Sequence, residues 1–515
     1  MHEDDDQREQ LTLRRFDKRQ RPREMEAHAQ PPRGLRSMSG ISARRRGLLL
    51  AALAPPIVDV AGYVKQTAPA RPDGGAALPD RAPSSDKIHA LLAEHVDIGR
   101  DSVGYVAMVR DADGPRLVAY GRAGGGNSRK LDGDTVFEIG SITKVFTALL
   151  LMDMVVRGEV ALADPVAKYL PPQGRPQAFD GKPISLLDLV TYTSGLPRMP
   201  SNFHPRDKAN PYADYTVQQL YTFLHDYTPR YYPGSHYEYA NLGFGLLGHV
   251  LSLRAGRSYE DLVVTRICDP LGLNDTRITL TPAMLGRLAE GHNASLRPVP
   301  NWDILALAGA GALRSTANDM LRFLDACRGR RKSSLGPAIT RMLDVRRQTS
   351  VTGVYAAAGW FVTTMHNDEL VVKAGGTGGY ATFIGYSTRT GIEAVLLANA
   401  ENGEITKTLG IHLLNADFPL PKLRRPEPID PKELRIYVGR YALTPRSVLT
   451  VTARADHLIV QATGGGNFAA FPESRTRFFF RLLDAQITFE FAPNGTVTGL
   501  VLYQPGSNRW ATRLP

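Results

Sequence analysis

Cysteine is scarce in this chain, which holds only Cys268 and Cys327 among its 515 residues. Two cysteines cannot form a disulfide framework or a cysteine-based zinc site, and we expect two buried apolar thiols rather than one bridge. The twelve histidines form no H-E-x-x-H or similar ligand spacing, so the sequence predicts no metal site, and we expect no cofactor. A G-x-S-x-G motif is also absent, which argues against an α/β-hydrolase esterase.

Long apolar runs are missing as well. The apolar run at residues 47–54 ends at Pro55-Pro56, far short of the roughly twenty residues that a membrane span needs. Three arginines, 44–46, precede it, and Ala68-Pro69-Ala70 provides small residues for cleavage. Residues 1–85 are therefore predicted to be a disordered N-terminus that carries a signal peptide over about 38–70. The adjacent arginines resemble a twin-arginine signal, and a Sec signal is the alternative.

This signal predicts an exported, periplasmic protein with no integral membrane span. Because some forty residues precede the basic region, we hypothesise that translation starts at Met38, which sequencing of the precursor's N-terminus would test. The alternative is a disordered basic tail on a cytoplasmic protein.

The overall composition is that of a globular protein. Hydrophobic residues make up 43% and charged residues 22%, which argues against a disordered, fibrous or polytopic membrane protein. The formal net charge is +11, and residues 1–46 contribute twelve basic against eight acidic residues to it. The remaining excess is spread along the chain, so the charge predicts no nucleic-acid partner. The oligomeric state cannot be read from the sequence.

The pattern along the chain predicts two folded regions. Residues 86–418 mix strand patterns, at 102–119 and 355–397, with a mainly helical stretch at 141–345, which indicates an α/β layer with a helical lobe. Five prolines fall within 419–431, which predicts a semi-rigid linker. Short alternating runs at 449–451, 458–460, 487–491 and 500–502 predict a small all-β domain, sandwich or barrel, over 432–515.

Ser141 and Lys144 are the first candidate catalytic pair. They stand at the start of a helix that is apolar on nearly every side, and such a helix is buried. Residues three apart on a helix share one face, and burial of an amine lowers its pKa, so Lys144 can take the hydroxyl proton of Ser141. Ser84 and Lys87 have the same spacing, but they lie in a polar, proline-flanked segment.

Two further elements carry candidate residues. Tyr239 and Asn241 lie two apart on a predicted loop, where a phenol can relay a proton and an amide can bind a carbonyl; alone, this pair would more simply be a turn. Lys373 ends an apolar strand that runs into a glycine cluster with Gly375 and Gly376. Backbone without side chains allows a substrate to approach closely, although a plain turn beside a solvated lysine explains this stretch equally well.

In chain order these elements read S-x-x-K, Y-x-N and K-x-G, and together they resemble the serine β-lactamase and penicillin-binding superfamily. The resemblance is closest to class C β-lactamases and related D-alanyl-D-alanine peptidases, and it covers roughly residues 86–415. It implies a β-lactamase-like α/β fold, an antiparallel sheet flanked by helices plus a helical lobe. The C-terminal region resembles the lipocalin-like barrel domain appended to some of these hydrolases.

The resemblance also implies roles for the candidate residues. Ser141 would form the acyl-enzyme, Lys144 and Tyr239 would exchange protons, and Asn241 would position the reactants. Lys373 would polarise the site, and backbone N–H groups of Ser141 and Gly376 would form the oxyanion hole, with Gly375 and Gly376 lining the substrate strand.

Three positions depart from the family pattern. Ala374 stands where the β-lactamases and peptidases place a hydroxyl residue, so a group that would bind a substrate carboxylate is missing. Thr143 replaces a smaller serine or alanine. Arg198-Met199 stands where class C enzymes carry a glutamine just after their Leu-Pro, so recognition by a side-chain amide is not expected.

Three functions remain open at this point. The leading hypothesis is an exported serine hydrolase that takes D-alanyl-D-alanine peptides or β-lactams as small-molecule or peptide substrates, with peptidase slightly favoured over β-lactamase. A carboxylic-ester hydrolase of the same fold is the second hypothesis, and Ala374 favours it. The third is a non-catalytic peptidoglycan-binding receptor, which would be expected to have lost the serine or the lysine.

Overall fold

The computed structural model describes residues 81–515, except for 125–128, 366, 421–422, 446, 464–466, 482–484 and 505–506. The predicted signal peptide and the proposed start at Met38 lie outside the described residues. Within them, no helix combines the length and the apolar character needed to cross a membrane.

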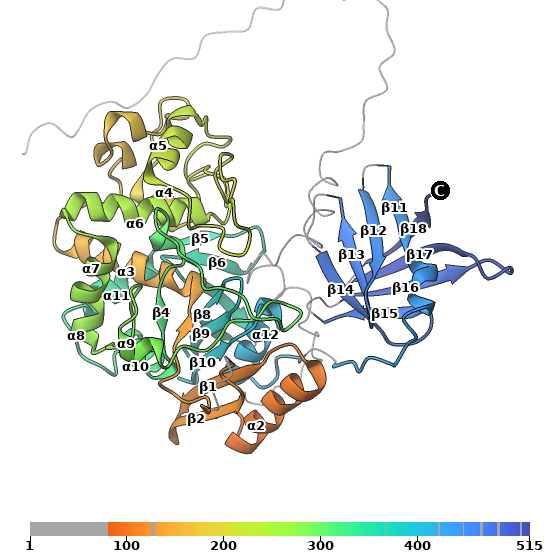
Figure 1. The fold of residues 1–515 in the computed structure, drawn as a ribbon. Coiled ribbons are helices and arrows are strands. Elements are labelled where there is room, and N and C mark those ends of the chain that lie inside the picture. Colours follow the sequence, from red (N-terminus) through yellow and green to blue (C-terminus); the bar gives the residue numbers. More distant parts are fainter. Residues whose placement is uncertain are drawn as a thin grey trace, which may run out of the picture. The chain divides into compact units, whose positions relative to one another are not determined.

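An antiparallel sheet forms the centre of residues 81–418 (Figure 1). It is built from segments at both ends of this region, because β1 pairs with β2 on one side and with β10 on the other. In the described residues it has eight strands, which lie in the order β2 (Gly114–Gly121), β1 (Gly104–Asp111), β10 (Glu393–Ala398), β9 (Ala381–Ser387), β8 (Asp368–Gly376), β7 (Phe361–Met365), β6 (Val354–Ala357) and β5 (Arg346–Gln348).

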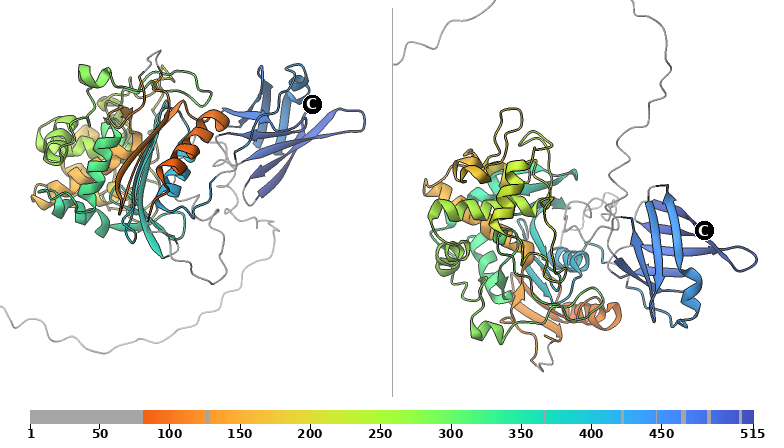
Figure 2. Two further views of the ribbon diagram at one scale, coloured as in Figure 1. Left: turned by 90° about the horizontal axis from the view of Figure 1, so that it is seen from below. Right: turned by 45° about the horizontal axis from the view of Figure 1, so that its top comes forward.

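Helices cover both faces of this sheet (Figure 2). Two of them, α2 and α12, pack on one face, and the helical lobe packs on the other. The central strands β9 and β10 are buried throughout, as expected for strands covered on both sides. The helices are α2 (Ser85–Glu94), α3 (Thr143–Val156), α4 (Leu186–Val190), α5 (Val217–Asp226), α6 (Asn241–Ala255), α7 (Tyr259–Val263), α8 (Asp269–Leu271), α9 (Pro282–Leu285), α10 (Ala317–Cys327), α11 (Gly336–Asp344) and α12 (Gly403–Leu414).

Shorter elements join the sheet to the lobe. Strands β3 (Phe137–Glu138) and β4 (Arg314–Ser315) form a two-stranded pair. Along the chain, β3 comes shortly before α3, and β4 comes shortly before α10. The short helices are η2 (His95–Gly99), η3 (Gly140–Ile142), η4 (Val166–Lys168), η5 (Pro172–Gly174), η6 (Val264–Cys268) and η7 (Ala308–Ala310). Cys268 and Cys327 are free thiols, as predicted; Cys268 is buried, whereas Cys327 is only partly buried and not fully buried as expected.

Two helices of the lobe bring the site together. α3 is buried along nearly its whole length, from Thr143 to Met154, which confirms the prediction of a helix without a polar face. α6 packs against η7 through its glycines: a Cβ on Gly245 would lie 2.5 Å from Leu307, and one on Gly248 would lie 3.0 Å from Gly309. These glycines therefore allow close packing of α6.

The C-terminal region forms a closed barrel. Its described strands number eight, neighbours in sequence pair antiparallel, and β18 closes on β11. Tyr437 of the short helix η8 (Glu433–Tyr437) packs its ring against Phe478 and Phe489 inside the barrel. The strands are β11 (Gly439–Thr444), β12 (Ser447–Ala453), β13 (Leu458–Ala462), β14 (Asn467–Pro472), β15 (Arg477–Phe480), β16 (Gln486–Phe491), β17 (Val497–Gln504) and β18 (Ser507–Arg513).

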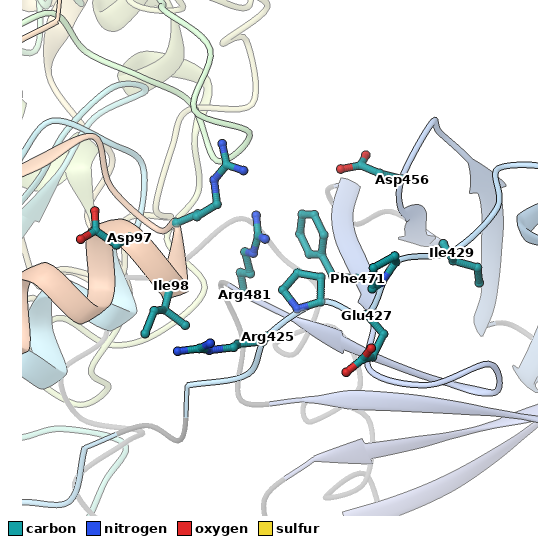
Figure 3. A pocket seen from close by; sticks show the side chains of 11 residues that line it. Asp97, Ile98, Arg425, Glu427, Ile429, Asp456, Phe471 and Arg481 are labelled. Atoms are coloured by element: carbon teal, nitrogen blue, oxygen red, sulfur yellow. The ribbon is translucent and has the colours of Figure 1, made fainter.

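The segment before the barrel is attached to it by specific bonds. Glu427 N donates to Pro472 O at 2.8 Å, and Arg424 pairs with Glu473 at 2.5 Å. Figure 3 shows Glu427 of this segment together with Phe471 and Arg481 of the barrel, whose guanidinium carbon lies 3.7 Å from the Phe471 ring centroid. The predicted fold class, a β-lactamase-like α/β region followed by a barrel, is confirmed.

We predict that Gly245→Ala lowers the free energy of unfolding by about 1–3 kcal/mol, because the new Cβ would overlap Leu307. The matched control is Gly286→Ala, where the backbone is α-helical and the nearest atoms lie 3.7 Å away. The control should leave stability unchanged or slightly raised. Denaturant unfolding measures both; equal stabilities would show that the close approach of α6 and η7 is not required.

Candidate active site

Ser141 lies on η3, in a turn pressed against the end of strand β8. Gly140 has a φ of +48°, and a Cβ there would lie 2.6 Å from Gly376 N. On the facing strand, a Cβ on Gly375 would lie 2.1 Å from Ile139 O and 3.0 Å from Ser141 N. Side chains at either position would push the two backbones apart. The glycines thus place the Ser141 hydroxyl at the point where the helical lobe meets the sheet.

Lys144 lies one turn after Ser141 and is fully buried. Its Nζ lies 2.9 Å from Ser141 Oγ, 2.9 Å from Asn241 Oδ1 and 2.6 Å from Ala310 O. Burial lowers the pKa of Lys144 well below its ordinary value, and the positive charges of Lys373 and Arg198 lower it further. A neutral amine can donate to the two carbonyl oxygens and accept the Ser141 proton with its lone pair.

Tyr239 contacts Ser141 from the other side. Its hydroxyl donates to Ser141 Oγ at 2.9 Å, so this oxygen lies between the phenol and the Lys144 amine. Burial raises the pKa of Tyr239 to about 12, although the Ser141 hydrogen bond and the charge of Arg198 oppose the rise. The phenol therefore keeps its proton at neutral pH and can donate it.

Asn241 is the first residue of α6, not a loop residue as predicted, while Tyr239 lies just before the helix. Its Oδ1 accepts from Lys144, and its Nδ2 donates to the Tyr212 hydroxyl at 3.1 Å. The helix fixes the direction of this side chain, and Tyr212 orients its amide.

Lys373 reaches the site from β8. Its Nζ donates to the Tyr192 hydroxyl at 2.9 Å and lies 5.1 Å from the centroid of the Tyr239 ring. Tyr192 stacks on Tyr239 with ring centroids 4.8 Å apart. Its φ of +59° is unusual for a residue with a side chain, and such a conformation costs about 1–3 kcal/mol. This strained backbone holds the ring between Lys373 and Tyr239.

All the predicted site residues therefore lie close together: Ser141, Lys144, Tyr239, Asn241, Lys373, Gly375 and Gly376. Sequence analysis did not identify Tyr192, Tyr212 or the carbonyl of Ala310 as parts of the site, although all three lie within residues 86–415, which the resemblance covers. Thr143 has a clear structural role, since its Oγ1 accepts from Leu313 N at 3.1 Å.

The second S-x-x-K sequence has a different role. Ser84 is the N-cap of α2 and accepts a hydrogen bond from Lys87 N, and both residues are exposed. In the part of the chain that the structure describes, no group of three or more His, Cys, Asp or Glu side chains is placed to hold a metal ion.

Ser141 shares hydrogen bonds with a buried lysine and a tyrosine, in a fold that combines an antiparallel sheet with a helical lobe. These features define the protein as a serine hydrolase. The chain belongs to the Beta-lactamase family, whose family model matches residues 88–418. A second model, described as a domain of unknown function (DUF3471), matches residues 423–512.

Individual proteins of known name also resemble this chain in sequence or structure. D-alanyl-D-alanine-carboxypeptidase/endopeptidase AmpH of Escherichia coli is 29% identical over 319 residues, which cover 59% of this chain and 81% of AmpH. Penicillin-binding protein 4* of Bacillus subtilis is 25% identical over 422 residues, covering 77% and 91% of the two chains. The solved β-lactamase/D-alanine carboxypeptidase of Yersinia pestis, complexed with citrate, superposes with a TM-score of 0.54 at 26% identity, covering 63% and 94%.

We predict that Lys144→Met stabilises the protein more at low pH than at high pH. Because the folded-state pKa of Lys144 is lowered, the native state binds fewer protons than the unfolded state, and wild-type stability rises with pH up to the unfolded pKa of about 10.4. Methionine does not titrate. The stability difference should therefore grow as pH falls, by at most about 1.4 kcal/mol per pH unit, until the folded-state pKa is reached.

Denaturant unfolding of both proteins between about pH 6 and pH 9 measures this difference. The hydrogen bonds that methionine loses add the same amount at every pH, so only the slope is informative. A difference that does not vary with pH would mean that Lys144 remains charged in the folded protein.

Proposed function

We propose that this hydrolase acts on D-alanyl-D-alanine peptides or β-lactams through an acyl-enzyme on Ser141. Of the two activities, we favour the peptidase over the β-lactamase as the physiological role. The observation that carries the proposal is the position of Ser141 Oγ, 2.9 Å from Lys144 Nζ and 2.9 Å from the Tyr239 hydroxyl. The names of AmpH and of the Yersinia pestis enzyme support this substrate class.

The proposed acylation begins with neutral Lys144. Ser141 Oγ attacks the carbonyl carbon of the substrate amide while its proton passes to Lys144 Nζ. The C–N bond then breaks, and the leaving nitrogen takes a proton from the Tyr239 hydroxyl, which lies on the opposite side of Ser141 Oγ. Proton transfer from Lys144 to Tyr239 then returns both groups to their starting states. Water later cleaves the Ser141 ester and releases the acid.

Backbone groups and charges assist this reaction in our proposal. The N–H groups of Ser141 and Gly376 lie on the two segments that Gly140 and Gly375 bring together, and there they would stabilise the oxyanion. Asn241 would hold Lys144 in place and contact the acyl group. Lys373 would add positive potential where negative charge develops.

Hydrolysis of carboxylic esters is the second candidate function, and Ala374 favours it. This residue is buried on β8 next to Lys373 and offers no hydroxyl to a substrate carboxylate. An ester lacks the leaving-group carboxylate of a penicillin or a C-terminal peptide, so it would not need that hydroxyl. The same Ser141, Lys144 and Tyr239 would perform the reaction.

We also propose that the protein is exported. The support is the basic segment and short apolar run of residues 44–54, which lie outside the described residues. After export and removal of the signal peptide, the purified mature protein is expected to begin after about residue 70.

We predict that Ser141→Ala abolishes covalent labelling by benzylpenicillin and by a fluorophosphonate and leaves the fold intact. Ser84→Ala is the matched control, because Ser84 belongs to the other S-x-x-K sequence and caps an exposed helix end. It should label like the wild type. Intact-mass spectrometry after incubation measures both variants, and labelling that persists in Ser141→Ala would show that another serine is the nucleophile.

The same incubation of the wild type with benzylpenicillin separates the possible activities. A lasting adduct on Ser141 indicates a penicillin-binding peptidase, whereas rapid loss of free drug with little adduct indicates a β-lactamase. Neither adduct nor turnover, with retained labelling by the fluorophosphonate, would favour the ester hydrolase.

We predict that Lys144→Met lowers the acylation rate of Ser141 by about a thousandfold or more, because nucleophile and base act as a unit. In the wild type this rate should rise with pH as Lys144 loses its proton, and this rise should be absent from the variant. The control is Lys87→Met, at the corresponding position of the exposed sequence, which should react normally. A fall of less than tenfold would assign Lys144 a structural role only.

A further inference from the structure

Arg198 is a cation of the site that the proposed mechanism does not use. It follows Leu196-Pro197, and its carbonyl accepts a hydrogen bond from Leu242 N at 3.2 Å, next to Asn241. Its guanidinium carbon lies 5.4 Å from the centroid of the Tyr239 ring. The residue as a whole is only partly buried, so part of it faces solvent even though its Nη1 is buried.

The hydrogen bonding of Arg198 is incomplete. Its Nη1 is buried and has no hydrogen-bond partner among the described residues. A buried N–H of a guanidinium without an acceptor is costly, and such groups persist in proteins mainly where water or a ligand completes them. Among the described residues no side chain or backbone group accepts from this N–H, so water or a ligand can complete it.

The charges around Arg198 indicate which acceptor fits. Among the described residues, the groups whose charge shifts the pKa of Lys144 are Lys373 and Arg198; both are cations, and no carboxylate contributes to this shift. Both also lie near the Tyr239 ring, at 5.1 Å and 5.4 Å from its centroid. A site of this potential attracts anions, and a guanidinium binds a carboxylate through two parallel hydrogen bonds.

We propose that Arg198 binds a carboxylate of the substrate beside Asn241 and so selects anionic substrates. The inference rests on the proposed function in that Ser141 must react with the bound molecule. The carboxylate can belong to the acyl part of the substrate or to its leaving group. In the second case Arg198 replaces the hydroxyl that Ala374 does not offer.

The test compares pairs of substrates that differ by one carboxylate. Carbenicillin and benzylpenicillin differ on the acyl side, as do mono-p-nitrophenyl glutarate and p-nitrophenyl valerate. An N-acyl-D-alanyl-D-alanine and its C-terminal amide differ on the leaving group. Rates are measured for the wild type, for Arg198→Met and for Arg198→Lys. The ratio within a pair cancels the effect that Arg198 has on Lys144 in the free enzyme, because both members react with the same Ser141 and Lys144.

We expect Arg198→Met to reduce the preference for the anionic member about 10- to 100-fold in at least one type of pair, and Arg198→Lys to retain part of it. A change in the two acyl-side pairs assigns the carboxylate to the acyl group, and a change in the peptide pair assigns it to the leaving group. Ratios that stay within about twofold in every pair would overturn the proposal.

The design also separates this proposal from the proposed function. An enzyme that reacts with neither penicillins nor peptides would contradict the proposed function. The nitrophenyl ester pair would still report on Arg198, since an activated ester requires only a reactive serine.

Discussion

The structure of the site depends on the burial of one amine without a negative partner. Lys144 has no solvent exposure, its bonding partners are a hydroxyl and two carbonyl oxygens, and the nearest charges are positive. These surroundings disfavour an ammonium ion relative to the neutral amine, which is why the pKa of Lys144 is lowered. The burial of helix α3 from Thr143 to Met154 makes this possible, because it keeps water away from Lys144.

The helical lobe and the sheet must meet for the Lys144 amine to act within a site that also contains Lys373 and Gly375. Ser141 and Lys144 belong to the helical lobe, whereas Lys373 and Gly375 belong to the sheet. The backbones touch only because Gly140 and Gly375 have no side chains. Helix α6 completes the arrangement, since its own glycines let it approach η7, whose Ala310 carbonyl accepts from Lys144.

The sequence was sufficient to predict the elements that depend on local patterns. Spacing and apolar surroundings selected Ser141 and Lys144 over Ser84 and Lys87, and alternating runs predicted the C-terminal β domain. Contacts between distant residues could not be predicted in this way. Tyr192 joins Lys373 across 181 residues, and its position depends on a left-handed backbone that no local pattern indicates.

The surroundings of Ser141 push the pKa values of its two neighbours in opposite directions. Desolvation disfavours the charged form of each group, so it lowers the pKa of Lys144 and raises that of Tyr239 to about 12. Lys144, whose lowered pKa favours the neutral amine, then lies on one side of Ser141, and Tyr239, which keeps its proton at neutral pH, lies on the other. This separation favours Lys144 as the base and Tyr239 as the donor in acylation. Arg198 lowers both pKa values, so an anion bound to it would raise both and weaken the donor while it strengthens the base. The proposed binding of a substrate carboxylate to Arg198 would therefore couple substrate charge to proton transfer through one guanidinium.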